Sequence, residues 1–105
     1  MAWIEDHLDD PDLDPAAIAG AHFISTRYLH LLFEDHEVSV ARHVRERRLE
    51  RIRRDLADPA LRGVPVSGVA ARWGIGDAAR FSRVFRERYG VSPSAYRAGG
   101  GAADG

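Results

Sequence analysis

The sequence predicts an all-α fold in which one helical unit occurs twice and a long helix joins the two copies. The first observation is a repeat: residues 29–34 recur as residues 81–86, and residues 18–19 recur as residues 69–70. The second is that apolar residues recur at helical spacing, with no alternating strand pattern. Each copy is therefore expected to form a helix-turn-helix, and two successive copies suggest a protein that reads two turns of DNA.

The size and composition of the chain fit one compact domain, or two very small ones that share a core. Of its 105 residues, 45% are apolar, which is enough for a packed core. There is no run long enough for a membrane span and no signal-peptide pattern. The absence of cysteine excludes disulfides and thiolate metal sites and fits a reducing cytoplasm.

Charge is distributed unevenly along the chain. The first 14 residues carry six acids and no arginine, whereas residues 21–98 carry 15 arginines against nine acids, a net charge of 15 − 9 = +6. No lysine is present. Arginine forks bind phosphates and guanine edges bidentately, although a genome rich in G and C would also favour arginine codons. The sequence thus predicts an acidic start followed by a basic body.

Capping signals divide the first half of the chain into four helices. Apolar spacing predicts a short first helix at residues 3–8, and Asp14-Pro15 is a strong start signal for the second. Ser25 is expected to cap the third helix, and Ser39 to cap a long linker helix over about residues 39–57. The side chains expected to face inward from the third and fourth helices are Leu29, Leu32, Phe33, Val40, Ala41, Val44, Ile52 and Leu56, with His36 at the edge.

The second half repeats this order after a connector at residues 60–65. A helix over residues 66–72 is followed by a glycine turn at residues 74–76, and Asp77 is expected to cap the next helix. That helix should bury Phe81, Val84, Phe85 and Tyr89. Gly90 suits a left-handed stop, and Ser92-Pro93 should open a last helix carrying Tyr96.

These elements give the expected domain limits. The domain should cover residues 1–98, with the first helix-turn-helix at about 15–36 and the second at about 66–90. The Gly/Ala-rich stretch 99–105 is expected to be a disordered tail.

The second helix of each unit should expose a face suited to a DNA groove. At about 100° per residue, Arg83 lies about 200° and Arg86 about 140° from the inward-facing Phe81. Ala79 shares this outer face, and its small side chain would let the helix sit deep, with Arg80 as a further candidate. In the first unit the inward Leu29 leaves an outer face made of Thr26, Arg27, His30 and Leu31.

Each outer residue also has a simpler interpretation. Arg83 can donate two hydrogen bonds to guanine, but an arginine on an exposed helix face is often only solvated surface. Leu31 could touch a thymine methyl or could be an exposed apolar or interface residue. His22 and His36 are expected at the core edge, and only His30 at DNA.

Phosphate contacts are expected from helix starts and from a basic ridge on the linker helix. The ridge consists of Arg45, Arg47, Arg48, Arg51, Arg53 and Arg54, of which about half are expected to pair with Glu46, Glu50 and Asp55 on the same helix. The residues expected to contact phosphates are Ser25, Arg45, Arg48, Arg51, Arg72 and Arg86.

No pattern in the chain points to catalysis. The histidines lack metal-ligand spacing, no glycine-rich phosphate loop follows a strand, and no Ser, His and Asp set has positional support. We therefore expect neither an enzyme nor a cofactor or metal site.

Three segments closely resemble the signature of the AraC/XylS family of bacterial transcription regulators: residues 69–75, 81–86 and 89–97. The first copy is similar through residues 24–29, Phe33 and residues 48–50, so the resemblance covers roughly residues 3–98.

This resemblance implies two helix-turn-helix subdomains whose recognition helices enter adjacent major-groove segments. The implied base-facing residues are Thr26, Arg27, His30 and Leu31 in the first copy and Ala78, Ala79, Arg80 and Arg83 in the second. The implied partners are double-stranded DNA and RNA polymerase, with no membrane, in the bacterial cytoplasm at the nucleoid. The chain would act as a monomer, either as a single-domain member or as the detached C-terminal domain of a larger ligand-responsive regulator.

The first copy departs from the family pattern. Phe23 takes the turn position where a glycine is common, as at Gly74, and Leu31 stands where a polar reader is frequent. Glu37 and Val40 stand where the second copy has Gly90 and Pro93.

A second hypothesis follows from this weakened copy and the acidic start: a helical protein-interaction module that has lost base reading. The acidic segment could contact another protein or fold back on the basic face and inhibit it, and deleting residues 1–14 would discriminate these alternatives.

Overall fold

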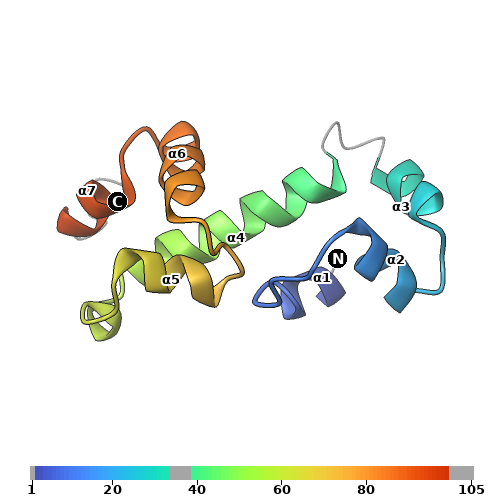
Figure 1. Ribbon diagram of the computed structural model, residues 1–105, viewed down its shortest axis with the longest axis horizontal. Coiled ribbons are helices and arrows are strands. Elements are labelled where there is room, and N and C mark those ends of the chain that lie inside the picture. The colour runs from blue at the N-terminus through green and yellow to red at the C-terminus, as the bar shows by residue number, and fades with distance from the viewer. Residues whose placement is uncertain (1, 34–38, 100–105) are drawn as a thin grey trace.

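The computed structural model describes residues 2–33 and 39–99. It contains α1 (Ala2–Asp6), α2 (Pro15–Ala21), α3 (Thr26–Phe33), α4 (Val40–Leu56), the 3-10 helix η2 (Pro59–Leu61), α5 (Val66–Arg72), α6 (Ala78–Tyr89) and α7 (Pro93–Ala98). The described residues include no strand, which confirms the predicted all-α class (Figure 1). The expectations for His36, Glu37 and residues 100–105 lie outside the described ranges.

Side-chain caps fix the starts of the helices where the sequence predicts them. The caps join a side-chain oxygen to the N–H three residues on, at 2.7 Å from Asp14 to Ala17, 3.0 Å from Ser25 to Tyr28, and 3.1 Å for the pairs Ser39–Arg42, Asp77–Arg80 and Ser92–Ala95. Each cap satisfies one of the free N–H groups at a helix start. The left-handed stop is also confirmed, since Gly90 has φ of 80°.

Two hydrophobic clusters form the core, and α4 contributes to both. The first cluster comprises Ile4, Leu8, Leu13, Ile18, Ala19, Leu29, Val40 and Val44. The second comprises Leu49, Ile52, Leu56, Val69, Ala70, Phe81, Val84 and Phe85. Trp73 packs against both clusters. Each helix-turn-helix therefore has its own core, and α4 with Trp73 makes them one structure.

Two residues expected inside are exposed. Leu32 on α3 is 48% exposed, and Ala41 on α4 is also exposed. Both lie beside positions that are fully buried, Leu29 on α3 and Val40 on α4. The apolar stripe of each helix is thus narrower than the hydrophobic pattern suggested.

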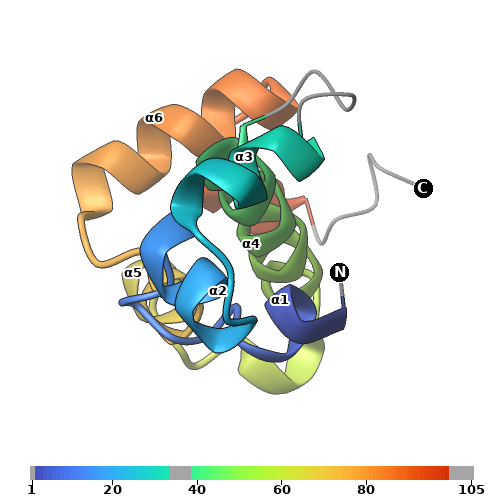
Figure 2. The ribbon, with the colours of Figure 1, turned by 90° about the vertical axis from the view of Figure 1, so that its right-hand side faces the viewer.

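The arrangement of the helices separates the two units along α4. The molecule measures 43 × 24 × 24 Å, and α3 lies at one end of its long axis, whereas α6 lies nearer the other end, with α7 beyond it (Figure 1). Figures 1 and 2 both place α3 and α6 toward the same, upper side of the molecule, whereas α1 lies on the lower side of α4. The two second helices can therefore face one surface together.

Candidate nucleic-acid interface

The turns of the two helix-turn-helix units share one hydrogen-bond pattern. The N–H of Ile24 donates to the carbonyl of Ala19 at 3.0 Å, and the N–H of Ile75 donates to that of Ala70 at 3.0 Å. Phe23 and Gly74 occupy the same place in the turn, with φ of 56° and 84°. Only the second has the residue type that tolerates this backbone without strain. The second turn then includes one more residue, Gly76, before its helix cap.

The face of α6 that points away from the core carries the predicted base-contacting residues. Phe81 is 1% exposed and Phe85 is fully buried, and they hold the inner face in the second cluster. The predicted residues on the opposite side are all exposed: Ala78, Ala79, Arg80 and Arg83. Neither Arg80 nor Arg83 forms an ion pair within the described part of the chain. Near the start of α6, which carries small side chains, both guanidinium groups are therefore without an ion-pair partner among the described residues.

The matching face of α3 is more apolar. Leu29 is fully buried, and the four predicted base-contacting residues are exposed: Thr26, Arg27, His30 and Leu31. Tyr28, Leu31 and Leu32 are 51%, 53% and 48% exposed, and Phe23 in the turn is 97% exposed. The first unit thus offers one cation and several apolar side chains, in contrast to the arginines of α6.

The predicted phosphate-contacting residues divide into accessible and engaged groups. Arg72 is exposed at the end of α5, and Arg86 is exposed on α6. Arg45 is half-buried on α4. Ser25 is exposed, and its hydroxyl accepts the N–H of Tyr28 as a cap. These four residues remain candidates for phosphate contact.

The prediction that Arg48 contacts phosphate is wrong. Arg48 is 9% exposed, and its guanidinium donates to the backbone carbonyl of Leu8 at 3.0 Å and to that of Asp10. It also packs against Gly74, where an added Cβ would lie 2.9 Å from the Arg48 Cζ. Burial lowers the pKa of Arg48, with the charge of Asp10 acting in the opposite direction. Arg48 is thus a structural link between the N-terminal segment and the second turn.

The structure also gives no support to a phosphate role for Arg51. Glu5 on α1 accepts from Arg47 Nε at 2.5 Å and from Arg51 Nη2 at 3.4 Å, and the Arg51 guanidinium lies 5.9 Å from the centre of the Trp73 ring. Burial raises the pKa of Glu5, but the hydrogen bonds and charges of the two arginines outweigh it and hold that pKa below its ordinary value. These contacts hold both arginines toward α1, on the side of α4 away from α3 and α6 (Figure 2).

The acidic N-terminal segment is therefore part of the folded domain. Ile4 and Leu8 are fully buried in the first cluster, and Leu13 is 6% exposed. The segment does meet basic residues, as one hypothesis proposed, but α1 does not cover α3 or α6 (Figures 1 and 2). In this arrangement, α1 therefore does not form an inhibitory cover over the recognition helices α3 and α6.

The expectation of a single basic ridge on α4 is also wrong. The six arginines of that ridge are distributed over ten consecutive positions, so they lie around the whole helix. Arg48 is buried, Arg47 pairs with Glu5 and Glu50, and the Arg53 guanidinium lies 5.0 Å from the centre of the Tyr89 ring. Same-helix pairing is confirmed for Arg47 with Glu50, and Glu46 pairs with Arg42, outside the ridge, at 3.2 Å. Asp55 instead accepts the indole N–H of Trp73 at 2.7 Å.

His22 and His43 pack against the rest of the domain, whereas His30 is exposed on α3. The Nδ1 atom of His22 lies 2.9 Å from the carbonyl oxygen of Ile18, and its ring meets Trp3 edge-on, so the expected place at the core edge is confirmed. Burial lowers the pKa of His43, whose ring meets that of Phe33 at 5.5 Å between centroids.

Across the described ranges there is no cluster of three His, Cys, Asp or Glu residues placed to hold a metal. Nor does any helix there have the length and apolarity to cross a membrane.

A family model described as a helix-turn-helix domain matches residues 18–99, which include both turns and both exposed faces. The chain belongs to the AraC/XylS family. Its relatives within this family include the transcriptional activator NphR of a Rhodococcus species, which is 37% identical over 94 residues. The arabinose operon regulatory protein of Escherichia coli K12 is 33% identical over 98 residues.

The AraC/XylS relatives differ in how much of their length this chain matches. The alignment covers 90% of this chain but 27% of NphR, and 92% of this chain but 32% of the arabinose operon protein. The regulatory protein SoxS of Escherichia coli K12 is 34% identical over 101 residues, which cover 92% of this chain and 88% of SoxS. The chain therefore spans about a third or less of the first two relatives and most of the third.

Two solved structures share the fold of this chain. The C-terminal domain of AraT, a response regulator from Geobacillus stearothermophilus, has a TM-score of 0.80 at 26% identity over 91% of this chain and 78% of that chain. A DNA-binding transcriptional dual regulator from Escherichia coli K-12 has a TM-score of 0.84 at 23% identity, with 96% and 87% covered, and shows the same fold.

Sequence reasoning missed the contacts that join this AraC/XylS domain internally. Glu5 with Arg47, Asp55 with Trp73, and Arg48 with Gly74 each connect separate elements. One available signal was the helical register: Arg48 lies four residues after Val44 and four before Ile52, both of which were expected inside. Its inward position could have been read from that spacing.

Proposed function

We propose that this chain binds double-stranded DNA in a sequence-specific manner and regulates transcription, with α3 and α6 in adjacent segments of the major groove. The observation that carries the proposal is the pair of matching turns, each of which is followed by a helix with a buried inner face and an exposed outer face. Both helices lie on one side of α4, so one duplex can meet both (Figure 2). A non-enzymatic role is part of this proposal.

The two helices are proposed to read different chemistry. On α6, Arg83 and Arg80 are free guanidinium groups suited to guanine edges, while Ala78 and Ala79 let the helix approach the base pairs closely. On α3, Arg27, Thr26 and His30 are polar readers, and the half-exposed Leu31 is suited to a thymine methyl. The second half-site is thus proposed to be guanine-containing and the first to be richer in thymine.

Phosphate contacts are proposed for Arg45, Arg72 and Arg86, with Ser25 at the start of α3. Such contacts fix the register of the protein without reading sequence. The chain is proposed to bind as a monomer, with about 34 Å between its recognition helices, the length of one helical turn of DNA.

In vitro selection from random duplex pools tests this proposal. We expect recovery of a motif with two half-sites spaced by about one helical turn. Affinity for that motif should fall steeply with salt, because roughly 6–10 phosphate contacts would release bound counterions. Failure to enrich any sequence at moderate salt, with a chain shown to be folded by circular dichroism, would overturn the proposal.

RNA polymerase is the proposed protein partner, as expected for a chain related to proteins named as activators. The exposed apolar residues Phe23, Tyr28 and Leu32 on the first unit favour a protein contact in addition to DNA. Single-round transcription with purified polymerase tests this. We expect the selected motif upstream of a weak promoter to change transcript yield, and no change in either direction would remove polymerase from the proposal.

A further inference from the structure

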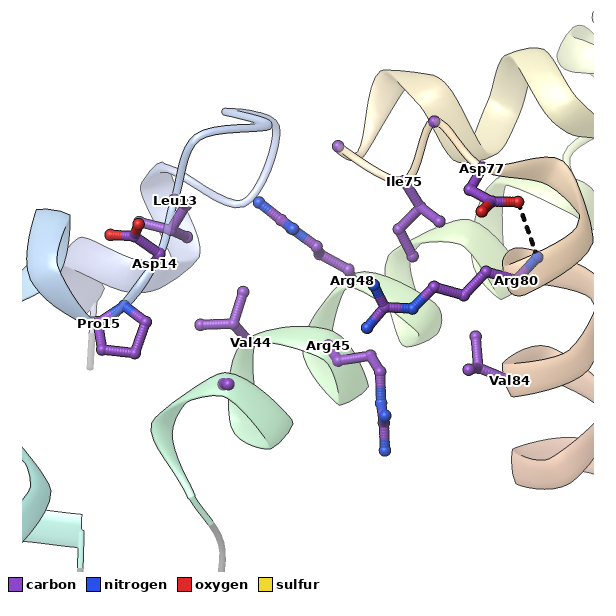
Figure 3. A pocket seen from close by; sticks show the side chains of 13 residues that line it. Leu13, Asp14, Pro15, Val44, Arg45, Arg48, Ile75, Asp77, Arg80 and Val84 are labelled. Atoms are coloured by element: carbon purple, nitrogen blue, oxygen red, sulfur yellow. Dashed lines mark hydrogen bonds between the residues drawn. The ribbon is translucent and has the colours of Figure 1, made fainter.

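A cavity of about 520 Å³ lies between the two helix-turn-helix units (Figure 3). Its walls come from the start of α2, one side of α4, the turn before α6 and the first half of α6. Sites for small organic molecules commonly have volumes of about 300–1,000 Å³ and lie where two structural units meet. The cavity thus has the size and the position of a ligand site.

The cations of this cavity lack carboxylate partners. Arg45, Arg48 and Arg80 line it, and none of them forms an ion pair with a carboxylate in the two described ranges. The Arg48 guanidinium is bonded to neutral backbone carbonyls alone, and the Arg45 Nε is buried with no hydrogen-bond partner among the described residues. The charge of Asp10 partly offsets the burial of Arg48, but no carboxylate in the described ranges pairs with Arg45, so an incoming anion would be stabilised beside Arg45.

The two carboxylates of the cavity do not neutralise these cations. Asp14 accepts the N–H of Ala17 at 2.7 Å, and Asp77 accepts the N–H of Arg80 at 3.1 Å, so each serves the start of its own helix. In Figure 3 the carboxylate of Asp14 points away from the side chain of Arg80, which extends from α6 across the cavity toward α4. With three arginines against two aspartates, the walls carry a net charge of 3 − 2 = +1.

The remaining wall is apolar. Leu13, Val44, Ile75 and Val84 line the cavity, and they come from both halves of the molecule. A DNA phosphate would use the cations but would gain nothing from this wall. A ligand that combines one negative group with an apolar body would use both.

We propose that this cavity binds a small organic anion, a carboxylate carried on a compact apolar body, and that its occupation weakens DNA binding. The carboxylate is held by Arg45 and Arg80, and the body lies against Val44 and Ile75. The second part rests on the proposed function, because Arg80 is also a proposed base reader. A guanidinium held by the ligand is not available to a base, so the two ligands oppose each other, and by linkage the effect is reciprocal.

Titration of the DNA-free chain with 2-naphthoate, followed by calorimetry and amide NMR shifts, tests the site itself. We expect saturable binding with a dissociation constant of about 1 mM or tighter. The uncharged 2-naphthamide, which has nearly the same shape, should bind at least about tenfold more weakly, a difference of about 1.4 kcal/mol. No saturation by naphthoate, or equal binding of acid and amide, would overturn the proposal.

Three variants locate the site. Arg45→Gln should weaken naphthoate binding about tenfold or more, and Ala41→Phe, which fills the cavity and leaves its charges in place, should weaken it as well. Arg54→Gln is the matched control, since Arg54 is exposed on the same helix and does not line the cavity. If Arg54→Gln weakened binding as much as Arg45→Gln, the effect would come from general charge and the site would be rejected.

A titration with inorganic phosphate distinguishes a site for an organic anion from a general phosphate-binding site. We expect phosphate to bind much more weakly than naphthoate, and equal binding would show that the apolar wall contributes nothing, which contradicts the proposal.

A mobility-shift titration with the selected DNA then tests the coupling between the two ligands. Naphthoate should weaken DNA binding by the unaltered chain and have little effect on DNA binding by Ala41→Phe. Binding of naphthoate without any effect on measured DNA affinity would reject the regulatory part alone, and absence of DNA binding would reject the proposed function without touching the site.

Discussion

The guanidinium of Arg48 packs directly on the backbone of Gly74, which leaves no room for a side chain at that glycine. A Cβ there would lie 2.9 Å from the Arg48 Cζ and 3.2 Å from the Pro11 Cα. Gly74 also has φ of 84°, a conformation that costs other residues about 1–2 kcal/mol. One glycine thus fixes both the turn of the second unit and its contact with the N-terminal segment.

Replacing Gly74 by alanine should therefore be strongly destabilising. We expect Gly74→Ala to lower the free energy of unfolding by about 2 kcal/mol or more, from the backbone strain and from displacement of Arg48. Chemical denaturation measures this. Gly20→Ala is the control, because nothing lies within 4 Å of a Cβ at Gly20 inside α2 and alanine there should add about 0.5–1 kcal/mol. Equal effects of the two changes would contradict the tight contact.

The backbone strain at Phe23 should be relieved when glycine replaces it. It holds φ of 56° in the first turn while its side chain is 97% exposed, so its ring contributes no burial. Phe23→Gly should raise the free energy of unfolding by about 0.5–1 kcal/mol, since glycine adopts this backbone without the Cβ clash. Phe23→Ala keeps the strain and should leave stability nearly unchanged. A loss of stability in Phe23→Gly would show that the ring makes a contact of its own.

Arg83 and Arg86 should affect DNA binding in different ways. Arg83→Ala is expected to cost about 1–3 kcal/mol at one guanine position and to relax preference there. Arg86→Ala should weaken all sequences about equally and reduce the salt slope by about one unit. Arg51 was also expected to contact phosphate but does not suit this comparison, because its guanidinium is held by Glu5. Binding curves on single-base variants of the selected motif at several salt concentrations would decide, and identical profiles would refute the division.

Deletion of residues 1–14 should unfold the first unit and not merely change DNA affinity. The segment buries Ile4, Leu8 and Leu13, and each such side chain contributes about 1.5–3 kcal/mol, so their sum approaches the whole stability of a small domain. Circular dichroism should show lost helix and a lowered midpoint. A deleted chain with unchanged melting would mean that the segment is a dispensable tail.

Acidification should weaken the fold in two steps. The pKa of His43 is lowered from 6.5 by burial, so the unfolded chain takes up a proton first and stability falls as the pH drops below about 6.5. The pKa of Glu5 is lowered from 4.5 by its arginine contacts, despite the opposing effect of burial, so its contribution is present above about 4.5 and is lost below that. Urea denaturation across this range measures both steps.

Glu5→Gln isolates the lower step. Glutamine keeps the shape of Glu5 but cannot titrate, so the variant should lose stability at neutral pH and show a flatter pH dependence below about 4.5. The loss near pH 6 should remain, since it belongs to His43. An unchanged acid limb in the variant would show that Glu5 is not its source.

The sequence by itself determined the elements of this protein. Asp14, Ser39 and Asp77 start helices because their short side chains can reach a free N–H three residues on, and this needs no distant contact. Gly90 ends α6 for a similarly local reason. The inward residues Leu29 and Phe81 follow from helical periodicity, and they leave Arg27 and Arg83 outside. Fold class, the starts of the capped helices and the exposed faces of both second helices could therefore be predicted, whereas the end of α1 and the 3-10 helix at Pro59–Leu61 were not.

Only the tertiary structure decided which arginines are free. Arg51 and Arg54 look alike in the sequence, yet Arg51 is held by Glu5 and Arg54 is exposed. The helical register places Arg48 inward, but only the fold shows that its guanidinium donates to the backbone carbonyls of Leu8 and Asp10. An arginine's surroundings depend on segments about 40 residues away in the chain, which no local pattern encodes. The same holds for the cavity between the two units, because its walls exist only once α4 holds both units in their relative positions.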